Sequence, residues 1–366
     1  MAYLNHGTVG LTPWPILRQA AAWREAIESN PARFLRLELP DRLAWARGEV
    51  ARFVGARPDD LVFAVNATAG CGAVLGSLRL APGDEILLTD HGYGAVRHAA
   101  QHVAGRSGAR LATLGLPFPE SDPAALPALL GRALRPRTRL VVLDHITSET
   151  ALPLPLAEAV ALCRGAGVPV LVDGAHAPGH LTLDLDALAA DWYVGTLHKW
   201  AFAPRGAAFL WARSDRQDDL EPSAISWGYR QGLQASFGWT GTSDPTPYLA
   251  APAGLVFLAG LGGPAVRARN AALAREAAAM LRGCWRGPEP AVGDNGLAMH
   301  LVALPEGFAA NPSAALRLRD RLLRSHRIEV PVIARAGRLW LRLSAQVYNE
   351  LADYERLVPA IAAERG

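Results

Sequence analysis

Short apolar runs alternate with longer amphipathic segments along about the first two-thirds of the chain. The apolar runs have the length of buried strands and end at turn residues, whereas the amphipathic segments repeat their apolar positions with helical spacing. The runs predict strands at Leu61–Val65, Glu85–Leu88, Arg110–Leu114, Leu140–Leu143, Val168–Val172 and Trp192–Thr196. The amphipathic segments predict helices at Pro13–Glu28, Asp41–Val54, Gly92–Ala104, Pro123–Leu134 and Leu156–Gly165. This alternation predicts an α/β fold with a mostly parallel sheet covered on both faces.

The pattern changes after about Gly262. A long helix rich in alanine and arginine is predicted at Ala265–Arg282, and the elements after it alternate less regularly. These later segments are Ala298–Leu304, Ser313–Ser325, Arg338–Ser344 and Asn349–Ala363. We therefore expect a large domain over residues 15–255 and a small α+β domain over residues 256–366.

One uncharged stretch, Tyr248–Val266, raises the question of a membrane span. Prolines and glycines interrupt it, so we expect a helix buried in a globular core and no membrane partner. The N-terminus lacks the basic region and apolar run of a signal peptide. Cys71, Cys163 and Cys284 are an odd number of cysteines at wide spacing and predict no disulfide framework. These features together favour a cytoplasmic protein.

The chain uses arginine almost everywhere that it carries positive charge. Of its 37 lysines and arginines, only Lys199 is a lysine. The net charge is +3 and no basic stripe is present in the sequence, so nucleic acid is not an expected partner. Lys199 lies in an aromatic, largely uncharged segment after the predicted strand Trp192–Thr196. A guanidinium stays protonated and cannot replace an amine that must form an imine. This location favours a covalent role for Lys199 over chance survival in an arginine-rich chain.

A second candidate, Asp173, ends the apolar run Leu171-Val172-Asp173 and is followed by Gly174-Ala175-His176. In open α/β sheets, ligands bind at the carboxyl ends of strands, where this carboxylate is expected to lie. By itself such an aspartate is more often a turn or capping residue. Together with Lys199 it supplies the amine and the carboxylate that pyridoxal phosphate requires, one for an imine and one for the pyridinium nitrogen.

Several short motifs then occur in an order that is similar to one known family. They are Asp173-x-x-His176, His198-Lys199, Pro204-Arg205-Gly206, Asn5-His6-Gly7, Trp239-Thr240-Gly241-Thr242-Ser243-Asp244 and Leu341-Arg342-Leu343-Ser344 followed by Tyr348-Asn349. Along nearly the whole chain this order resembles the class V aminotransferases, pyridoxal-phosphate enzymes of fold type I, and within them the isopenicillin N epimerase-like branch. The resemblance implies a seven-stranded-type, mostly parallel sheet, a small C-terminal domain, and an N-terminal arm over residues 1–14 that contributes to the active site.

The resemblance also assigns site residues. It places the cofactor phosphate at the helix start formed by Asn66, Ala67 and Thr68, where backbone amides hold phosphate well. It places His198 near the same phosphate and Thr242 on the phosphate of a neighbouring subunit, which implies a homodimer with active sites at the interface. Arg342 corresponds to the clamp on the α-carboxylate of an amino acid substrate, and Asn5 and His6 to further substrate contacts.

Two assignments remain open between residues. The family places an aromatic ring over the pyridine at Tyr93, but many relatives carry histidine there, and His91 is a rival. Ser148 occupies the position at which desulfurase relatives carry an asparagine that contacts the cofactor hydroxyl. His176 is the alternative for that contact.

The resemblance implies an enzyme that acts at the α-carbon of an amino acid, with Lys199 as the base after it leaves an aldimine and Asp173 stabilising a quinonoid. It favours epimerisation, racemisation or C–S β-elimination over transamination. Desulfurase chemistry needs a cysteine shortly before the Arg342 segment, and the last cysteine, Cys284, lies far upstream. A class V aminotransferase proper and a non-catalytic binding or regulatory protein are the alternatives.

Two weaker motifs are set aside. Gly70, Gly72 and Gly76 miss the spacing of a dinucleotide-binding loop by one residue. The pairs His98/His102 and His176/His180 have metal-ligand spacing, but neither has the acidic partner of a metalloprotease helix, so no metal is expected.

Overall fold

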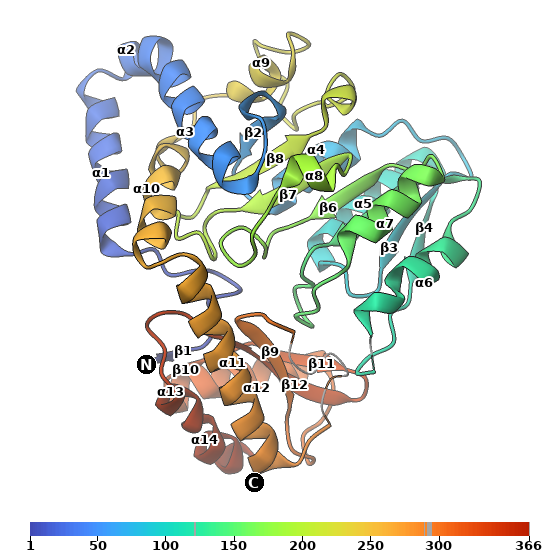
Figure 1. The fold of residues 1–366 in the computed structure, drawn as a ribbon, viewed down its shortest axis with the longest axis vertical. Helices are drawn as coiled ribbons and strands as arrows, with labels where there is room; N and C mark the ends of the chain where they lie inside the picture. The colour runs from blue at the N-terminus through green and yellow to red at the C-terminus, as the bar shows by residue number, and fades with distance from the viewer. Residues whose placement is uncertain (121, 289, 291–294, 366) are drawn as a thin grey trace.

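The computed structural model describes residues 1–120, 122–288, 290 and 295–365. It has a large body built on one sheet and a smaller body next to it, joined through the long helix α11 (Figure 1). The helices and helical turns of the large body are α1 (Trp14–Ser29), α2 (Pro31–Arg33), η1 (Phe34–Glu38), α3 (Leu39–Val54), η2 (Pro58–Asp60), α4 (Ala67–Ser77), α5 (Gly94–Ser107), η3 (Pro123–Ala125), α6 (Leu126–Ala133), α7 (Leu156–Gly165), α8 (Leu185–Leu188), η4 (Ser214–Arg216), α9 (Leu233–Gly238) and α10 (Thr246–Gly260).

The large sheet has seven strands, as the resemblance implied. In spatial order they are β2 (Leu61–Ala64), β8 (Ala208–Ala212), β7 (Trp192–Thr196), β6 (Val170–Asp173), β5 (Thr138–Asp144), β3 (Glu85–Thr89) and β4 (Arg110–Leu114). Strand β8 is antiparallel to both of its neighbours, and the other pairings are parallel. The predicted mostly parallel α/β sheet is therefore confirmed.

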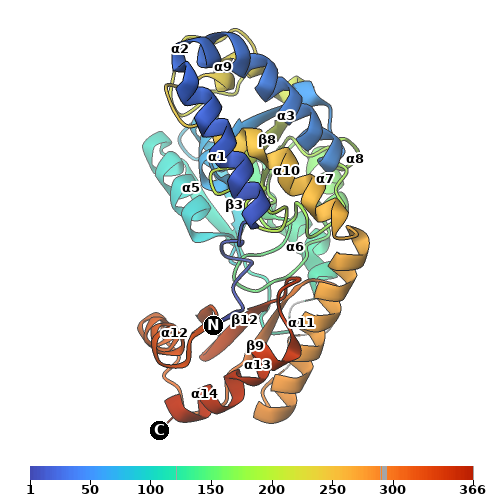
Figure 2. The ribbon, with the colours of Figure 1, turned by 90° about the vertical axis from the view of Figure 1, so that its left-hand side faces the viewer.

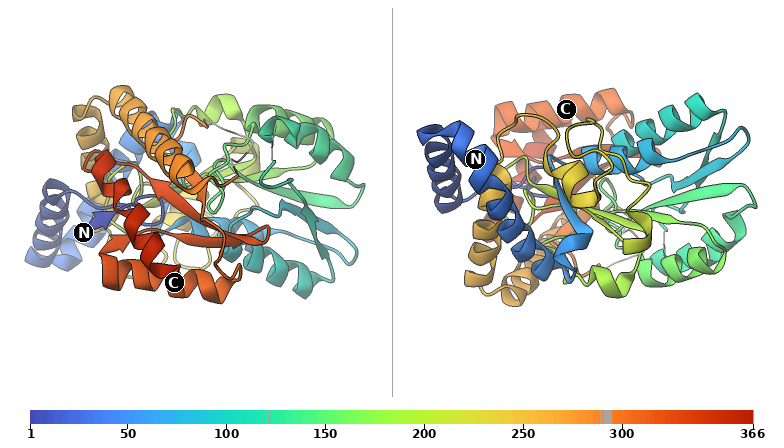
Figure 3. Two further views of the ribbon diagram at one scale, coloured as in Figure 1. Left: turned by 90° about the horizontal axis from the view of Figure 1, so that it is seen from below. Right: turned by 90° about the horizontal axis from the view of Figure 1, so that it is seen from above.

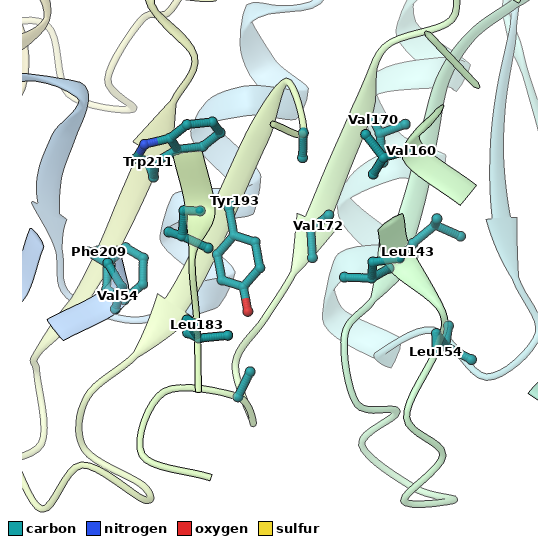
Figure 4. Packing of buried hydrophobic residues seen from close by; sticks show 14 of the residues in the cluster. Val54, Leu143, Leu154, Val160, Val170, Val172, Leu183, Tyr193, Phe209 and Trp211 are labelled. Atoms are coloured by element: carbon teal, nitrogen blue, oxygen red, sulfur yellow. The ribbon is translucent and has the colours of Figure 1, made fainter. Parts of the chain in front are cut away.

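Helices cover both faces of this sheet, which is why every residue of β6, β7 and β8 is buried. Helices α4 and α5 lie on one face and α6 and α7 on the other (Figure 3). Alternate residues of a strand point to opposite faces, so neighbours such as Val141 and Val142 join separate apolar clusters. On the α6/α7 face the rings of Tyr193 and Phe209 stack with centroids 6.3 Å apart (Figure 4).

The small body is an α+β unit, as predicted. Its elements are α11 (Pro264–Trp285), β9 (Met299–Ala303), α12 (Pro312–His326), β10 (Ile328–Glu329), β11 (Val332–Arg335), β12 (Arg338–Ser344), α13 (Leu351–Glu355) and α14 (Leu357–Glu364). Strands β11, β12 and β9 form an antiparallel sheet. The predicted segment Asn349–Ala363 is two helices, because Pro359 has no N–H to donate to the carbonyl of Glu355.

The uncharged stretch Tyr248–Val266 is not one helix either. Helix α10 ends at Gly260, α11 begins at Pro264, and the two helices are bent by 75°. Positive φ angles of 92° at Gly262 and 44° at Gly263 make this turn. In the described part of the chain no single helix is long and apolar enough to cross a membrane, although this bent pair meets the length and composition criteria together.

An N-terminal arm precedes α1 and runs from the small body to the large one (Figure 2). Its first strand, β1 (Ala2–Tyr3), pairs in parallel with β10 of the small body. The amide of Leu4 donates to the carbonyl of Glu329, and the amide of Ser344 donates to the carbonyl of Leu4. At the other end of the arm, the hydroxyl of Thr12 donates to the carbonyl of Ala203 in the large body at 3.3 Å.

Candidate active site

The carboxyl ends of the parallel strands meet at one edge of the large sheet, and the predicted site residues follow them. Asp173 ends β6 in register with Asp144, the last residue of β5. Lys199 follows β7 after a short turn, and Asn66 follows β2. Because strands β2 and β7 run in the same direction on either side of β8, the segments of Asn66 and Lys199 leave from the same edge. The topology therefore gathers the acid, the amine and the helix start.

The amine of Lys199 lies inside this edge beside a neutral histidine. Its Nζ is 3.1 Å from Nε2 of His176. Burial lowers the pKa of Lys199 to about 7, the negative charge of Asp173 opposes that shift, and the positive charge of Arg342 adds to it. Burial also lowers the pKa of His176 well below its usual value. The lysine is thus close to half deprotonated at neutral pH and faces an uncharged imidazole.

Asp173 is buried, with 4% of its surface exposed. Its Oδ1 accepts a hydrogen bond from the amide of Ala175 at 3.0 Å. Burial raises its pKa, while that amide and the positive charge of Lys199 lower it. Within the described residues no ion pair neutralises this carboxyl group, so it is free to meet a cationic ligand group such as a pyridinium.

The start of α4 is an open helix N-terminus. Asn66 is its N-cap and accepts a hydrogen bond from the amide of Ala69 at 2.8 Å, while Thr68 is exposed. A Cβ on Gly70 would lie 2.7 Å from Val194, so this glycine serves close packing of α4 on the sheet. His198 donates from Nδ1 to the carbonyl of Ala207 at 3.1 Å. Burial lowers the pKa of this imidazole to about 4, so the ring is neutral and Nε2 carries no proton.

His91 and Tyr93 are in different environments. His91 is buried, and its Nε2–H donates to the carbonyl of Leu116 at 3.2 Å, so Nδ1 accepts from the hydroxyl of Thr150 at 2.6 Å. Tyr93 precedes α5 and has 45% of its surface exposed. Both ring nitrogens of His91 are therefore occupied inside the protein, whereas the Tyr93 ring is accessible.

Arg342 is a buried guanidinium in β12 that faces the large body. Its Nη1 donates to the carbonyl of Ser148, and its Nη2 donates to the hydroxyl of Thr8 and to Oδ1 of Asn5, the latter at 3.4 Å. Its Nε has no hydrogen-bond partner among the described residues, and no ion pair of those residues includes it. Burial lowers its pKa to about 10, so it stays charged at neutral pH. A buried cation without a counterion is suited to binding a carboxylate.

Ser148 connects these groups, since its Oγ lies 3.4 Å from Nε2 of His176 while its carbonyl accepts from Arg342. His6 is fully buried, and Nε2 lies 2.9 Å from the carbonyl of Lys199. Thr242 is exposed, and its side chain makes no hydrogen bond with the other predicted site residues among those that the structure describes. The structure thus brings Asp173, Lys199 and Arg342 together with the predicted residues around them, which are His176, Ser148, Asn5 and His6. Thr242 lies outside this group.

Three groups in contact with the site were not predicted. Asp144 lies beside Asp173, Thr8 binds Arg342, and the hydroxyl of Tyr348 is 2.8 Å from Nδ1 of His6. Two of them have a sequence signal, because Thr8 follows Asn5-His6-Gly7 directly and Tyr348 belongs to the motif Tyr348-Asn349. No three His, Cys, Asp or Glu side chains form a metal-binding group in the described ranges.

Comparisons with known proteins identify the family. A sequence profile of the aminotransferase class-V family matches residues 11–281. The chain is 39% identical to an isopenicillin N epimerase of Amycolatopsis lactamdurans, over 98% of this chain and 94% of that protein. It is 32% identical to a probable chloroplastic L-cysteine desulfhydrase of Arabidopsis thaliana, over 98% of this chain and 82% of that protein.

A solved structure shares the fold. The cystine C–S lyase C-DES, in complex with its product cysteine persulfide, superimposes with a TM-score of 0.84 at 25% identity, over 99% of this chain and 97% of that chain. A mutant of the same lyase carries glycine covalently linked to its pyridoxal-phosphate cofactor. The chain belongs to the aminotransferase class-V family. The predicted family, fold type I and dependence on pyridoxal phosphate are confirmed.

The lowered pKa of Lys199 can be measured directly, because the chain has no other lysine. We expect the acylation rate of the Lys199 amine in the cofactor-free folded chain to reach half its maximum at about pH 7. Below that pH the amine is protonated and does not react. Mass spectrometry of the Lys199 peptide gives the rate. In the urea-unfolded chain the midpoint should return to about 10.4, the value of an ordinary lysine. Equal midpoints in the two states would contradict the expectation.

Proposed function

We propose that this chain removes the α-proton of an amino acid with Lys199 and that the α-carbon is reprotonated from the opposite face, as in an epimerase or racemase of the isopenicillin N epimerase kind. One observation carries the proposal: a continuous set of contacts joins a carboxylate-binding group to a base. Arg342 binds the carbonyl of Ser148, Ser148 Oγ approaches His176, and His176 lies 3.1 Å from Lys199. An amino acid bound by its carboxylate would have its α-carbon beside the amine.

The residues present fit pyridoxal phosphate. Asp173 is a buried carboxyl group without an ion pair in the described structure, as a pyridinium nitrogen requires, and the start of α4 offers free amides to a phosphate. We assign the phosphate to Asn66, Ala67, Thr68 and His198. Nε2 of His198 carries no proton in this structure and would have to gain one to donate, which the negative charge of a phosphate favours. When bound, the cofactor supplies an electron sink for the pair released at the α-carbon.

Two further contacts with the ring are proposed from the surroundings of each group. Tyr93 would cover the ring, since its side chain is accessible and both nitrogens of His91 are engaged. The contact with the cofactor hydroxyl is assigned to His176, with Ser148 supporting it, because Nδ1 of His176 is buried without a hydrogen-bond partner in the described part of the chain.

The side chains of this chain then divide the reaction between them. Arg342 holds the substrate carboxylate with its planar fork and fixes the α-carbon. Lys199, once its amine is free, takes the α-proton at Nζ, for which a pKa near 7 is well matched at neutral pH. The carboxyl group of Asp173 would face the ring nitrogen of the bound cofactor. Because Nζ of Lys199 lies 3.1 Å from His176 Nε2, the uncharged imidazole restrains the amine between transfers.

C–S β-elimination is the second candidate, and two observations favour it. The 32% identical relative is a probable L-cysteine desulfhydrase, and the superimposed structure is a cystine C–S lyase. Persulfide transfer by a protein cysteine has less support. Cys71 and Cys163 are buried. Cys284 is the penultimate residue of α11, and the C-terminal end of this helix lies away from the large sheet (Figure 1).

We also propose a cytoplasmic homodimer that binds a small amino acid substrate. The three cysteines are unpaired, as the cytoplasm would keep them. Thr242 is exposed and makes no side-chain hydrogen bond with the described residues of its own site, which suits a residue that completes the site of a second copy. In the same region Trp227 has 89% of its surface exposed, and large exposed apolar groups favour an interface.

The dimer can be tested by mixing two inactive variants. Lys199→Ala removes the base, and Thr242→Glu places a carboxylate against the phosphate of the partner site. If Thr242 acts across the interface, a mixed dimer contains one site with both native residues, and activity should return on mixing. Sedimentation should show dimers before and after mixing. No return of activity, with exchange of subunits verified, would contradict the assignment.

Arg342→Lys should lower kcat/KM for an amino acid by about 10²–10³-fold, because an ammonium keeps the charge but loses the two-pronged fork and leaves buried acceptors unpaired. The matched control is Arg338→Lys in the same strand, whose partner Glu306 is exposed. Exposed pairs contribute about 0–1 kcal/mol, so this variant should stay within about fivefold of the native chain. Equal losses in both variants would indicate a general disturbance of β12.

Isotope exchange tests the reaction itself. The cofactor-loaded chain is incubated in deuterated water with L-amino acids and with S-substituted cysteines, and products are analysed by mass spectrometry and chiral chromatography. Deuterium at the α-carbon with mixed chirality is expected for the epimerase. Pyruvate, ammonia and a released thiol would establish the lyase instead. Lys199→Ala should abolish either outcome, and normal turnover by this variant would contradict the role of Lys199.

A further inference from the structure

The N-terminal arm lies directly against the main chain of Lys199. A Cβ on Gly10 would lie 2.5 Å from the carbonyl oxygen of Lys199 and 2.9 Å from its Cα, so only glycine permits this approach. Four residues earlier, Nε2 of His6 lies 2.9 Å from the same carbonyl oxygen. The Lys199 peptide is therefore enclosed by the arm from two positions.

The hydrogen bonds of His6 fix its tautomer. A carbonyl oxygen only accepts, so His6 must carry its proton on Nε2 to bind Lys199, and Nδ1 must then accept the hydroxyl proton of Tyr348 at 2.8 Å. A second group competes for Nε2. The amide nitrogen of Gln346 lies 3.3 Å from it, and the carbonyl oxygen of that amide already accepts from Asn270 and Val347.

Two tautomers of His6 are thus available, and one group selects between them. With the proton on Nδ1, Nε2 would accept from Gln346 and the Lys199 carbonyl would lose its donor. The carbonyl of Lys199 excludes that state, because its oxygen lies 2.9 Å from Nε2 and can only accept a proton from it. The hydroxyl of Tyr348, which can donate or accept, then donates to Nδ1. His6 has no exposed surface, and its ring packs against Trp200 with centroids 5.0 Å apart, so the imidazole cannot turn away.

Tyr348 comes from the small body, shortly after the strand that carries Arg342. The arm contacts that arginine as well, through Thr8 and Asn5. The N-terminal arm therefore contacts both Arg342 and the main chain of Lys199. The chain of contacts runs from Tyr348 in the small body, through His6 in the arm, to Lys199 in the large body.

We infer that Tyr348 and His6 are positioning residues for Lys199: the tyrosine holds the imidazole at Nδ1, the imidazole holds the Lys199 carbonyl through Nε2–H, and the pair so aims the amine at its target. The inference rests on the proposed role of Lys199 as the base. Neither residue is a catalytic residue, because His6 reaches the lysine only through its main chain. Their contribution is to the placement of Nζ, and misplacement of a reacting group by about 1 Å costs about 10²-fold in rate.

The test compares matched substitutions. Tyr348→Phe keeps the ring and removes the hydroxyl. His6→Met and His6→Gln have similar length, but only glutamine can still donate to the Lys199 carbonyl. We expect Tyr348→Phe and His6→Met to lower kcat by about 10–10²-fold with little change in KM, since Arg342 is intact. His6→Gln should recover most of kcat. Tyr3→Phe, a tyrosine of the same arm that donates to the carbonyl of Val9, should behave like the native chain.

A second readout does not depend on turnover. Acylation of the single lysine in each full-length variant reports the environment of Nζ, and its pH midpoint should move in Tyr348→Phe and His6→Met but not in Tyr3→Phe. Unchanged midpoints and unchanged kcat in Tyr348→Phe would overturn the inference and leave the proposed function intact. Equal losses in Tyr3→Phe and Tyr348→Phe would also overturn it, because the arm would then act only by general stability. Absence of α-proton exchange in the native chain would contradict the proposed function instead, while the acylation midpoints would still decide the inference.

Discussion

The burial of one primary amine is the constraint on which the rest of the structure depends. Removal of Lys199 from water disfavours its charged form, and this effect is larger than the attraction of Asp173. Arg342 adds a second positive charge nearby and acts in the same direction. An amine with a pKa near 7 is available both as a nucleophile and as a base, which an ordinary lysine is not at neutral pH. The sheet edge supplies this environment, since it brings the ends of β6 and β7 together under the small body.

The small body and the arm complete that environment. Without β12 the edge would lack its guanidinium, and without the arm the guanidinium would lack Thr8 and Asn5. The two bodies meet at further polar contacts, including an ion pair of 3.0 Å between Arg335 and Asp90. The site is therefore a property of the assembled chain, and neither body contains it alone.

Much of this could be predicted from the sequence, for identifiable reasons. Three elements have the predicted bounds, because each has an apolar pattern that stops at a clear end signal. They are the strands Arg110–Leu114 and Trp192–Thr196 and the helix Leu156–Gly165. Lys199 and Asp173 stood out because few residue types can perform their chemistry. The apolar run of β8 is as clear in the sequence as those of the other strands. Its antiparallel direction is set by pairing with β2 and β7, which the run itself does not indicate.

Other features had no local signal. The two-residue strands β1 and β10 pair across more than three hundred positions, and no periodicity marks segments so short. Thr8 follows one of the quoted motifs and Tyr348 lies in another, but neither residue type indicates a contact with Arg342 or His6 until the fold brings them there. The resemblance named His6 as a substrate contact, whereas its ring nitrogens both face protein atoms. Proximity in three dimensions, rather than residue type, determines these roles.

The distribution of charge around the amine has a further consequence for the chemistry. Burial lowers the pKa of His6 and His198 to about 4 each and that of His176 well below its usual value, so these rings are uncharged at neutral pH. Arg342 keeps its proton up to about pH 10. Among these groups, Lys199 is the one whose charge changes near neutrality, in the direction of a free base as the pH rises. The neighbouring rings can thus accept or donate hydrogen bonds in fixed tautomers while the amine alone gains and loses a proton. A base that must remove the α-proton requires surroundings whose own charges stay constant while it does so.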